Sequence, residues 1–170
     1  MHRKQEELKT LPVHPTDRTG AEPRLIRVGG LVARPTELTL ADLQGLPQQE
    51  LIADFSCEEG WTVPDLKWRG PTLETVLAAL EPNSEAKWVQ ASAGEFSVPI
   101  PLQQACAALL AIELGDGPLP SEHGGPVRLV LPGGDCWTSI KWLDHLELRA
   151  QPGENTGQRI ALARLCSSNS

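Results

Sequence analysis

The sequence predicts a mixed α+β domain whose sheets are mostly antiparallel and whose helices are short. Two observations support this fold class. Several short apolar runs alternate with polar residues at the period of two that is typical of a half-buried strand. Apolar residues also recur at helical spacing, but only over short stretches, and strands and helices do not alternate regularly as they do in a parallel α/β sheet.

The first third of the folded region is expected to contain two strands and one short helix. Residues 24–28 alternate between apolar and polar side chains, which indicates a strand. Thr39 and Asp42 have the spacing of a capping box and predict the start of a helix. Residues 51–57 alternate again, so that Cys57 is expected at the end of a strand.

A second helix and a pair of strands are expected next. Pro71 suits the first turn of a helix, since it lacks the N–H that would have no partner there. The apolar positions of this helix form one stripe, namely Leu73, Val76, Leu77 and Leu80. Residues 88–93 and 95–100 are predicted to be two strands joined around Gly94.

A third helix is predicted from Pro101 onward, and its stripe places Cys106 in the core. The stripe consists of Leu102, Ala105, Cys106 and Leu109. After a turn at residues 115–118, the pattern predicts two strands, at 127–131 and 136–142, and the second runs towards a final segment at 146–149.

The chain is expected to divide into three parts. Residues 1–22 are polar and lack a hydrophobic period, so they are predicted to be a flexible arm. Residues 23–150 are predicted to form the folded domain, and residues 151–170, which are rich in Ser, Gly and Asn, a tail. With 170 residues, of which 40% are hydrophobic and 22% charged, one domain can bury a core without disulfides.

Charge and composition argue against several classes of partner. A net charge of −7 disfavours binding to nucleic acid or to an anionic membrane surface. The N-terminal residues show no apolar signal region and no stretch reaches membrane-spanning length, so we expect a cytoplasmic protein, although a removed export signal would leave no trace. The four cysteines are scattered without a CxxC pair, which argues against a structural zinc site and a disulfide framework.

Cys57 is the most informative cysteine because of its neighbours. Glu58 and Glu59 follow it directly, and their negative charge disfavours a free thiolate by raising the pKa of the thiol. A nucleophilic cysteine would favour a neighbouring His, Lys or helix N-terminus. A metal ion, in contrast, holds the sulfur deprotonated by its own charge. The residues alone leave a core cysteine, a metal ligand and a nucleophile as alternatives.

A second group of residues predicts an anion site in the region 122–142. Gly124 and Gly125 are expected to leave main-chain N–H groups open to an anionic oxygen. His123 and Arg128 flank these glycines with hydrogen-bond donors, and strand alternation points Arg128 away from the face of Val127. Taken singly, each feature has an ordinary structural explanation, such as a turn or a solvated arginine.

The strand predicted at 136–142 adds two donors to this group. Ser139 and Lys141 are expected to share one face of that strand, opposite Ile140. Because these residues lie within about twenty positions of His123, the whole set predicts a phosphate site. Neither a Walker loop nor a GxGxxG motif is present, so a nucleotide fold is not indicated.

The chain contains two long motifs, DFSCEEGWTVPDLKWRGPTLETVL and, further on, PLPSEHGGPVRLVLPGGDCWTSIKWLDHLEL. In this order they resemble the molybdopterin-binding oxidoreductase domain of the sulfite oxidase family. The resemblance runs from about Arg24 to Arg149 and is strongest to the small stand-alone members and to the catalytic subunit of the bacterial methionine-sulfoxide reductase system. It implies the sulfite-oxidase-type molybdopterin-binding fold and a molybdenum–molybdopterin cofactor.

The resemblance also implies a role for individual residues. Cys57 matches the family's thiolate ligand to molybdenum, which makes it the catalytic and metal-binding position. His123 and Arg128 match cofactor-contacting residues of the family. The segment that holds the pterin's phosphate in the family is matched by Ser139, the main chain of Ile140, and Lys141.

The implied function is that of a molybdenum-cofactor-dependent oxidoreductase that transfers an oxygen atom to or from a small substrate, such as an S-oxide or an N-oxide. Sulfite is less expected, because the run Glu58–Trp61 is acidic where sulfite oxidases proper have basic residues. The sequence shows no haem domain, so a separate electron-transfer partner is expected. Two alternatives remain open: a non-catalytic molybdopterin-binding or interaction module, and a metal-free cysteine enzyme.

Overall fold

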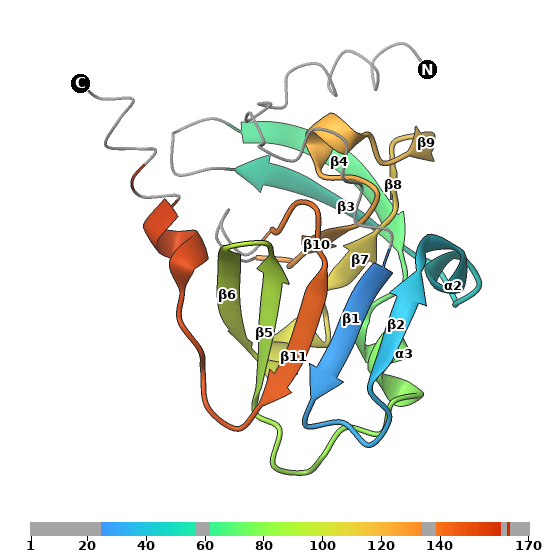
Figure 1. Cartoon of the computed structure of the whole chain (residues 1–170). Coiled ribbons are helices and arrows are strands. Elements are labelled where there is room, and N and C mark those ends of the chain that lie inside the picture. Colours follow the sequence, from blue (N-terminus) through green and yellow to red (C-terminus); the bar gives the residue numbers. More distant parts are fainter. Residues whose placement is uncertain (1–24, 57–61, 134–138, 161–162, 164–170) are drawn as a thin grey trace.

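The computed structural model describes residues 25–56, 62–133, 139–160 and 163, and Cys57 lies outside these ranges. Within them the chain forms three sheets joined by short helices (Figure 1). The strand pairs are antiparallel except for β1 with β11, which are parallel. The mixed, mostly antiparallel α+β class is therefore confirmed.

The largest sheet has five strands in the order β2-β1-β11-β5-β6. Its members are β1 (Leu25–Gly30), β2 (Thr36–Thr39), β5 (Trp88–Ala93), β6 (Phe96–Pro101) and β11 (His145–Arg149). The parallel contact arises because β11, the last strand, inserts between the first strand and the β5–β6 hairpin. The two ends of the folded region are thereby joined in one sheet.

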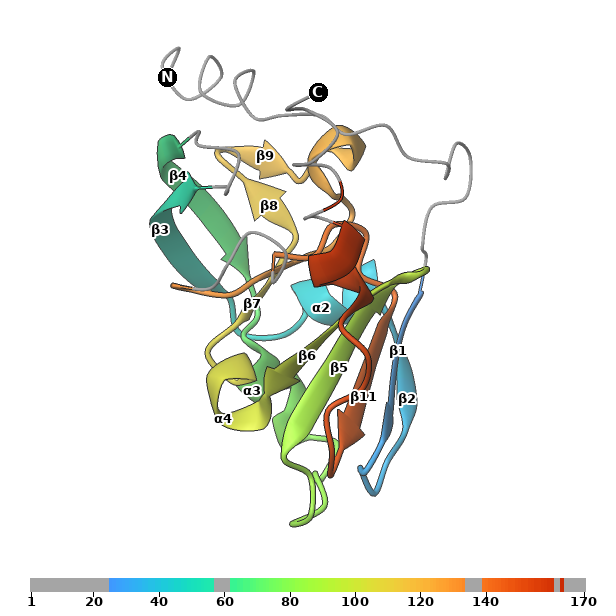
Figure 2. The same ribbon diagram turned by 90° about the vertical axis from the view of Figure 1, so that its left-hand side faces the viewer.

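Two smaller sheets complete the fold. One has the order β3-β4-β8-β9 and consists of β3 (Gln49–Ser56), β4 (Thr62–Gly70), β8 (Glu113–Leu114) and β9 (Gly117–Pro118). The other pairs β7 (Leu109–Ala111) with β10 (Arg128–Val130). In Figure 2 the five-stranded sheet lies on one side of the molecule and β3 and β4 lie on the other.

The helices are short, as the sequence predicts. Helix α2 (Leu40–Gln44) has the expected capping box, in which Thr39 Oγ1 accepts from the N–H of Asp42 and the Asp42 carboxylate accepts from the N–H of Thr39. Helix α3 (Leu73–Ala78) begins after Thr72, whose hydroxyl accepts from the N–H of Thr75. All four residues of its predicted stripe are buried.

The third helix is shorter than predicted. Helix α4 (Leu102–Ala105) spans a single turn, and Leu109 belongs to β7 rather than to the helix. Cys106 follows the helix end and is half-buried, so its predicted place in the core is wrong. The helical spacing from Leu102 to Leu109 was misleading because β7, in which all three residues are buried, follows shortly after the single helical turn.

The two-stranded β7–β10 sheet separates two hydrophobic cores. Leu110 and Leu129 pack with the five-stranded sheet and helix α3 in the larger core. Leu109 and Val130 point the other way, toward β4 and β8, in the smaller core. Because side chains of a strand alternate between faces, Arg128 lies on the same side as Val130. The predicted orientation of Arg128, opposite Val127 and Leu129, is confirmed.

The sequence predicts a strand at 136–142, and the structure describes residues 139–142 of it. Over these four residues no strand is found. These residues form a bend and a turn, although Ile140 exchanges both of its main-chain hydrogen bonds with Leu129, at 2.9 Å each. Trp142 has a φ of 54°, a left-handed conformation that strand backbone does not adopt. The chain turns here because the N–H groups of Trp142 and Leu143 donate to Gly124 and Val127 instead of to a continuing strand.

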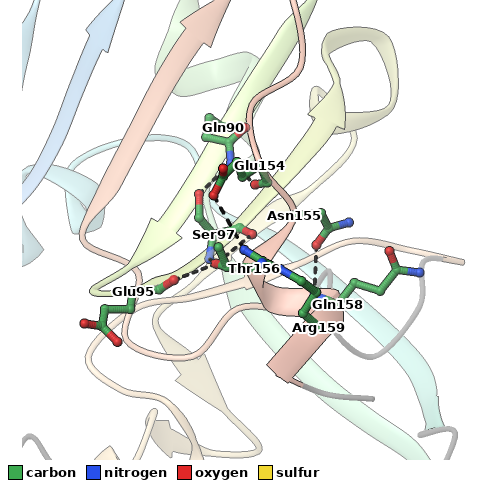
Figure 3. Close-up of polar contacts among 8 residues, drawn as sticks. All are labelled: Gln90, Glu95, Ser97, Glu154, Asn155, Thr156, Gln158 and Arg159. Carbon is green, nitrogen blue, oxygen red and sulfur yellow. Dashed lines mark hydrogen bonds and ion pairs between the residues drawn. The ribbon is translucent and has the colours of Figure 1, made fainter. Parts of the chain in front are cut away.

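The segment after β11 is attached to the β5–β6 hairpin, as Figure 3 shows. The amide of Gln90 donates to the carbonyl oxygen of Glu154 at 2.7 Å, and the hydroxyl of Thr156 accepts from the N–H of Ser97 at 2.8 Å. Residues 156–160 are helical. The division of the chain at residues 22 and 150 stays a prediction, but residues 153–158 are held by side-chain hydrogen bonds.

No helix in the described part of the chain is both long enough and apolar enough to cross a membrane.

Candidate functional site

Arg128 is the centre of the candidate site. Its side chain is almost fully buried, with a relative exposure of 4%. The guanidinium donates from Nε to the Ser139 hydroxyl at 3.0 Å and from Nη1 to the main-chain oxygen of His123 at 3.1 Å. It also lies over the ring of Trp68, with Cζ 5.2 Å from the ring centroid. Burial of a cation is expensive unless it is hydrogen-bonded, so these contacts fix the position of Arg128.

Trp68 and Gly70 of β4 form the support beneath this arginine. Trp68 is completely buried in the smaller core. A side chain at Gly70 would overlap the main-chain oxygen of Leu110, so β4 and β7 approach each other closely at this point. Trp68 and Gly70 therefore both have a structural role, and Trp68 places an aromatic face under the guanidinium.

His123 ends a short 3₁₀ turn, η1 (Ser121–His123), and is 4% exposed. Its Nδ1 atom is buried, and Nε2 lies 3.9 Å from the carboxylate of Glu122. The turn ends at Gly124, which has a φ of 104°. The structure thus brings His123 and Arg128 together, as predicted, through the carbonyl of His123.

The two glycines after His123 do not form the predicted open nest for an anion. The N–H of Gly124 donates to Ser121 at 3.1 Å, and that of Gly125 donates to Pro120 at 2.9 Å. Glycine is required here for close packing instead. A Cβ atom at Gly124 would come within 2.8 Å of Lys141 Cγ, and one at Gly125 would overlap the main-chain oxygen of Leu119.

Ser139 and Ile140 both lie beside Arg128, but Ser139 forms its hydrogen bond through the side chain and Ile140 through the main chain. Ser139 is nearly buried, and its hydroxyl accepts the hydrogen bond from Arg128. Both main-chain groups of Ile140 are bonded to Leu129. A contact between the N–H of Ile140 and a cofactor would therefore have to replace the bond to Leu129. The predicted common face of Ser139 and Lys141 does not exist, because the chain turns after Ile140.

Lys141 reaches the same region from this turn. Its stem passes over Gly124, and its Nζ atom lies 5.5 Å from the centre of the Trp142 ring. The side chain is half-buried. A guanidinium, an imidazole, a hydroxyl and an ammonium group are therefore collected around one turn of a protein whose net charge is −7. This set of donors fits an anionic group such as a phosphate.

Cys57 and its acidic neighbours lie outside the described residues. The strand pair that carries this segment is described, and Ser56 at the end of β3 pairs with Thr62 at the start of β4. Among the described residues, no three side chains of His, Cys, Asp or Glu gather as metal ligands. The role of Cys57 as a molybdenum ligand stays a prediction.

Two contacts of this site were not expected from the sequence. The indole N–H of Trp142 donates to the main-chain oxygen of Ser121 at 2.8 Å, and Asp144 accepts from the N–H of Gly94 at 2.9 Å. The sequence does place several of its five tryptophans next to the two motifs, but core packing is the usual reason for such a position. The contact of the Trp142 indole could not be predicted, because it depends on the turn that the chain makes at Lys141.

Comparison with known proteins adds independent information. The family described as oxidoreductase molybdopterin binding domain matches residues 14–157. The chain is 34% identical over 121 residues to the oxidoreductase YuiH of Bacillus subtilis, which covers 69% of this chain and 61% of that protein. It is 31% identical over 152 residues to MsrP of Xanthomonas axonopodis pv. citri, the catalytic subunit of a protein-methionine-sulfoxide reductase. This alignment covers 78% of this chain and 47% of that protein.

A solved structure shows the same fold. The sulfane dehydrogenase SoxCD from Paracoccus pantotrophus superposes with a TM-score of 0.72 at 22% sequence identity, over 82% of this chain and 41% of that one. The sulfite-oxidase-type fold expected from the two motifs is thus confirmed. The chain spans 61% and 47% of the lengths of YuiH and MsrP, so it corresponds to a part of each.

Proposed function

Since the chain belongs to the family of oxidoreductase molybdopterin-binding domains and is a molybdopterin-dependent oxidoreductase domain, we propose that it transfers an oxygen atom to or from a small substrate at a cysteine-ligated molybdenum centre. The observation that carries this proposal is the buried Arg128 with Ser139 and His123 around it. A buried, pre-oriented guanidinium is suited to hold an anionic cofactor, because little freedom is lost on binding.

The residues of this chain would divide the work as follows. Arg128 and Lys141 would hold the phosphate end of the pterin through charge-assisted hydrogen bonds. His123 would contact the cofactor from the η1 turn, and Ser139 would orient Arg128. Cys57 would bind the metal through its thiolate. When bound, the molybdenum cofactor supplies the change of oxidation state that the reaction needs.

The proposed substrate class is an S-oxide or a similar oxide. The name of the MsrP relative supports this choice, since it is a methionine-sulfoxide reductase. Reduction of a sulfoxide to a thioether consumes two electrons and two protons and releases water, so a separate electron-transfer partner is required. Sulfite is disfavoured as a substrate, because Glu58 and Glu59 follow the proposed metal ligand and repel an anion. Cytoplasmic localisation stays a prediction.

The test of the proposed function is the content of molybdenum and pterin in protein made by a host that synthesises the cofactor. We expect near-stoichiometric molybdenum and pterin in the wild type. Cys57→Ser should abolish turnover of S-oxides with an artificial electron donor, whereas Cys106→Ser, a matched control away from the site, should not. A folded wild-type protein without molybdenum or pterin would contradict the proposal.

The same preparation distinguishes the non-catalytic alternative. In this alternative the chain binds the cofactor without catalysing turnover, and Arg128 would hold the cofactor in the same way. A loaded protein that fails to reduce any member of a panel of S-oxides and N-oxides would favour such a binding module.

A further inference from the structure

Trp142 adopts a backbone conformation that a bulky residue rarely takes. Its φ of 54° lies in the left-handed region, which costs free energy for residues other than glycine and is found at sites where the surroundings enforce it. Trp142 belongs to neither of the two hydrophobic cores formed by the described residues, and its side chain is only half-buried. Core packing therefore does not explain why this conformation is maintained.

The contacts of Trp142 show what enforces it. The main-chain N–H of Trp142 donates to the oxygen of Gly124 at 2.9 Å, and its indole N–H donates to the oxygen of Ser121 at 2.8 Å. One residue thus closes both ends of the turn that carries His123. The same indole ring lies 5.5 Å from the ammonium of Lys141.

The segment that follows Trp142 is also anchored by hydrogen bonds. Leu143 donates its N–H to Val127 at 3.0 Å, and Asp144 donates its N–H to Ser92 at 3.0 Å. The carboxylate of Asp144 accepts from Gly94 at 2.9 Å. The segment that follows Trp142 is therefore attached to the five-stranded sheet, so that Trp142 connects a rigid sheet to the η1 turn.

Gly124 makes this arrangement sterically feasible. Gly124 ends the η1 turn with a φ of 104°. Because it has no Cβ, there is room for the stem of Lys141; a Cβ at Gly124 would lie only 2.8–3.0 Å from Lys141 Cγ, Cβ and Cα. The η1 turn and Lys141 are packed directly against each other. Because His123 also supplies the oxygen that Arg128 contacts, a shift of this turn would move all three basic groups.

We propose that Trp142 is a positioning residue that holds the His123 turn against Lys141 and so presets both for the anionic end of the pterin cofactor. This inference rests on the proposed function. Its physical basis is preorganisation: donors that are already in place lose less conformational entropy when the ligand binds. The strain at Trp142 is offset by the two hydrogen bonds that it makes to the turn.

Two variants separate the contributions of Trp142. Trp142→Phe retains an aromatic ring near Lys141 but removes the indole N–H. Trp142→Asn removes the ring while a residue that tolerates the left-handed region remains. Trp88→Phe on β5 is the matched control, because Trp88 is also half-buried but lies outside the site. Thermal unfolding of each cofactor-free protein shows first that the variants are folded.

The first readout needs no cofactor. Amide hydrogen exchange of residues 121–125 in the cofactor-free protein should be about three- to tenfold faster in Trp142→Phe than in the wild type, which is the effect of about one lost hydrogen bond. Trp88→Phe should leave it unchanged. Equal exchange in Trp142→Phe and Trp88→Phe would overturn the role of the indole in holding the turn.

The second readout is the rate at which pterin is lost from the loaded protein. We expect the slowest loss in the wild type, about three- to tenfold faster loss in Trp142→Phe, and still faster loss in Trp142→Asn, so that the conservative variant recovers part of the retention. In a Lys141→Ala background, Trp142→Asn should have a smaller effect, because part of its action passes through Lys141.

The outcomes separate the two proposals. A wild type that retains pterin, with variants that lose it no faster than Trp88→Phe does, would overturn the role of Trp142 while the proposed function stands. Fully additive effects of Trp142→Asn and Lys141→Ala would show that Trp142 does not act through Lys141. A wild type that holds no pterin would overturn both proposals at the cofactor site.

Discussion

Replacing Thr156 with Val should lower the stability of the fold by about 1–2 kcal/mol, although Thr156 lies far from the candidate site. Its hydroxyl accepts from the N–H of Ser97 at 2.8 Å and donates to the main-chain oxygen of Glu95 at 2.6 Å. These two groups belong to the end of the β5–β6 hairpin, at the open edge of the five-stranded sheet. Figure 3 shows Thr156 between them.

The magnitude follows from the way the edge strand β6 is built. Since Ser97 points its N–H outward to Thr156, strand alternation directs residues 99 and 101 outward as well. Both are prolines, which have no N–H, so Ser97 carries the N–H on this edge that needs a partner. Valine has nearly the same shape as threonine but would leave that partly buried N–H without its acceptor, which accounts for most of the loss. Partial exposure to water keeps the loss at the lower end.

The assay is thermal unfolding followed by circular dichroism, with Thr156→Ser as the control that keeps the hydroxyl. For a domain of this size, a loss of about 1–2 kcal/mol corresponds to a decrease in Tm of about 2–8 °C. Thr156→Ser should remain close to the wild type, since it loses only a methyl group. If Thr156→Val and Thr156→Ser unfold at the same temperature, the hydroxyl does not hold the segment to the sheet and the reasoning is refuted.

Four further predictions follow from the described residues. Gly70→Ala should prevent folding or reduce stability severely, because its Cβ would overlap the oxygen of Leu110; soluble yield and Tm measure this. Arg128→Ala should lose bound pterin, because it removes charge-assisted hydrogen bonds of about 1.5–3 kcal/mol. Alkylation of Cys106 should require a more alkaline pH than that of a free thiol, because burial and, to a smaller extent, a nearby glutamate raise its pKa; peptide mapping by mass spectrometry follows it. Asp42→Asn should weaken the fold at neutral pH, as urea unfolding would show. The difference in stability between the wild type and Asp42→Asn should vanish as the pH falls below 3.8, the usual pKa of an aspartate. Hydrogen bonds with the helix N-cap Thr39 lower the folded-state pKa of Asp42, and protonation of the carboxylate removes the stability that they provide.

Three of these predictions have a control variant. Gly117→Ala should be tolerated, since a Cβ there meets no neighbour. Arg34→Ala, which removes an exposed arginine, should not affect pterin. Glu74→Gln should accelerate alkylation of Cys106 only slightly, because burial is the larger cause of the raised pKa. A Cys106 that reacts like a free thiol, or an Asp42→Asn protein whose stability difference is independent of pH, would contradict the respective assignment.

Local patterns predicted most of the elements correctly where the deciding interactions are local. The capping box at Thr39, the stripe on α3 and the β5–β6 hairpin all depend on residues a few positions apart, and all are found. The same patterns failed after Leu102, where a single helical turn leads directly into β7. Periodicity cannot distinguish one long helix from a short helix followed by a buried strand, since both place apolar residues at Leu102 and Leu109.

The candidate site shows a similar division. The residue types that suit an anion, His123, Arg128, Ser139 and Lys141, could be selected from the sequence because they lie within about twenty positions and match a long family motif. What each group does could not be predicted. The N–H groups of Gly124 and Gly125 are used inside the chain, and Ser139 serves Arg128. The glycine bonds depend on the conformation of a short turn, and the Ser139 bond depends on which segment lies beside Arg128; residue type alone encodes neither.

The sequence by itself determined the fold class, the family and the identity of the charged residues, because hydrophobic periodicity, turn chemistry and long motifs are properties of the chain. The tertiary structure alone decided that Trp68 lies under Arg128 and that Trp142 connects the His123 turn to Lys141. It also decided that residues 153–158 attach to the β5–β6 hairpin. Such contacts join segments far apart in the chain, and their geometry is fixed only when the sheets and the two cores pack together.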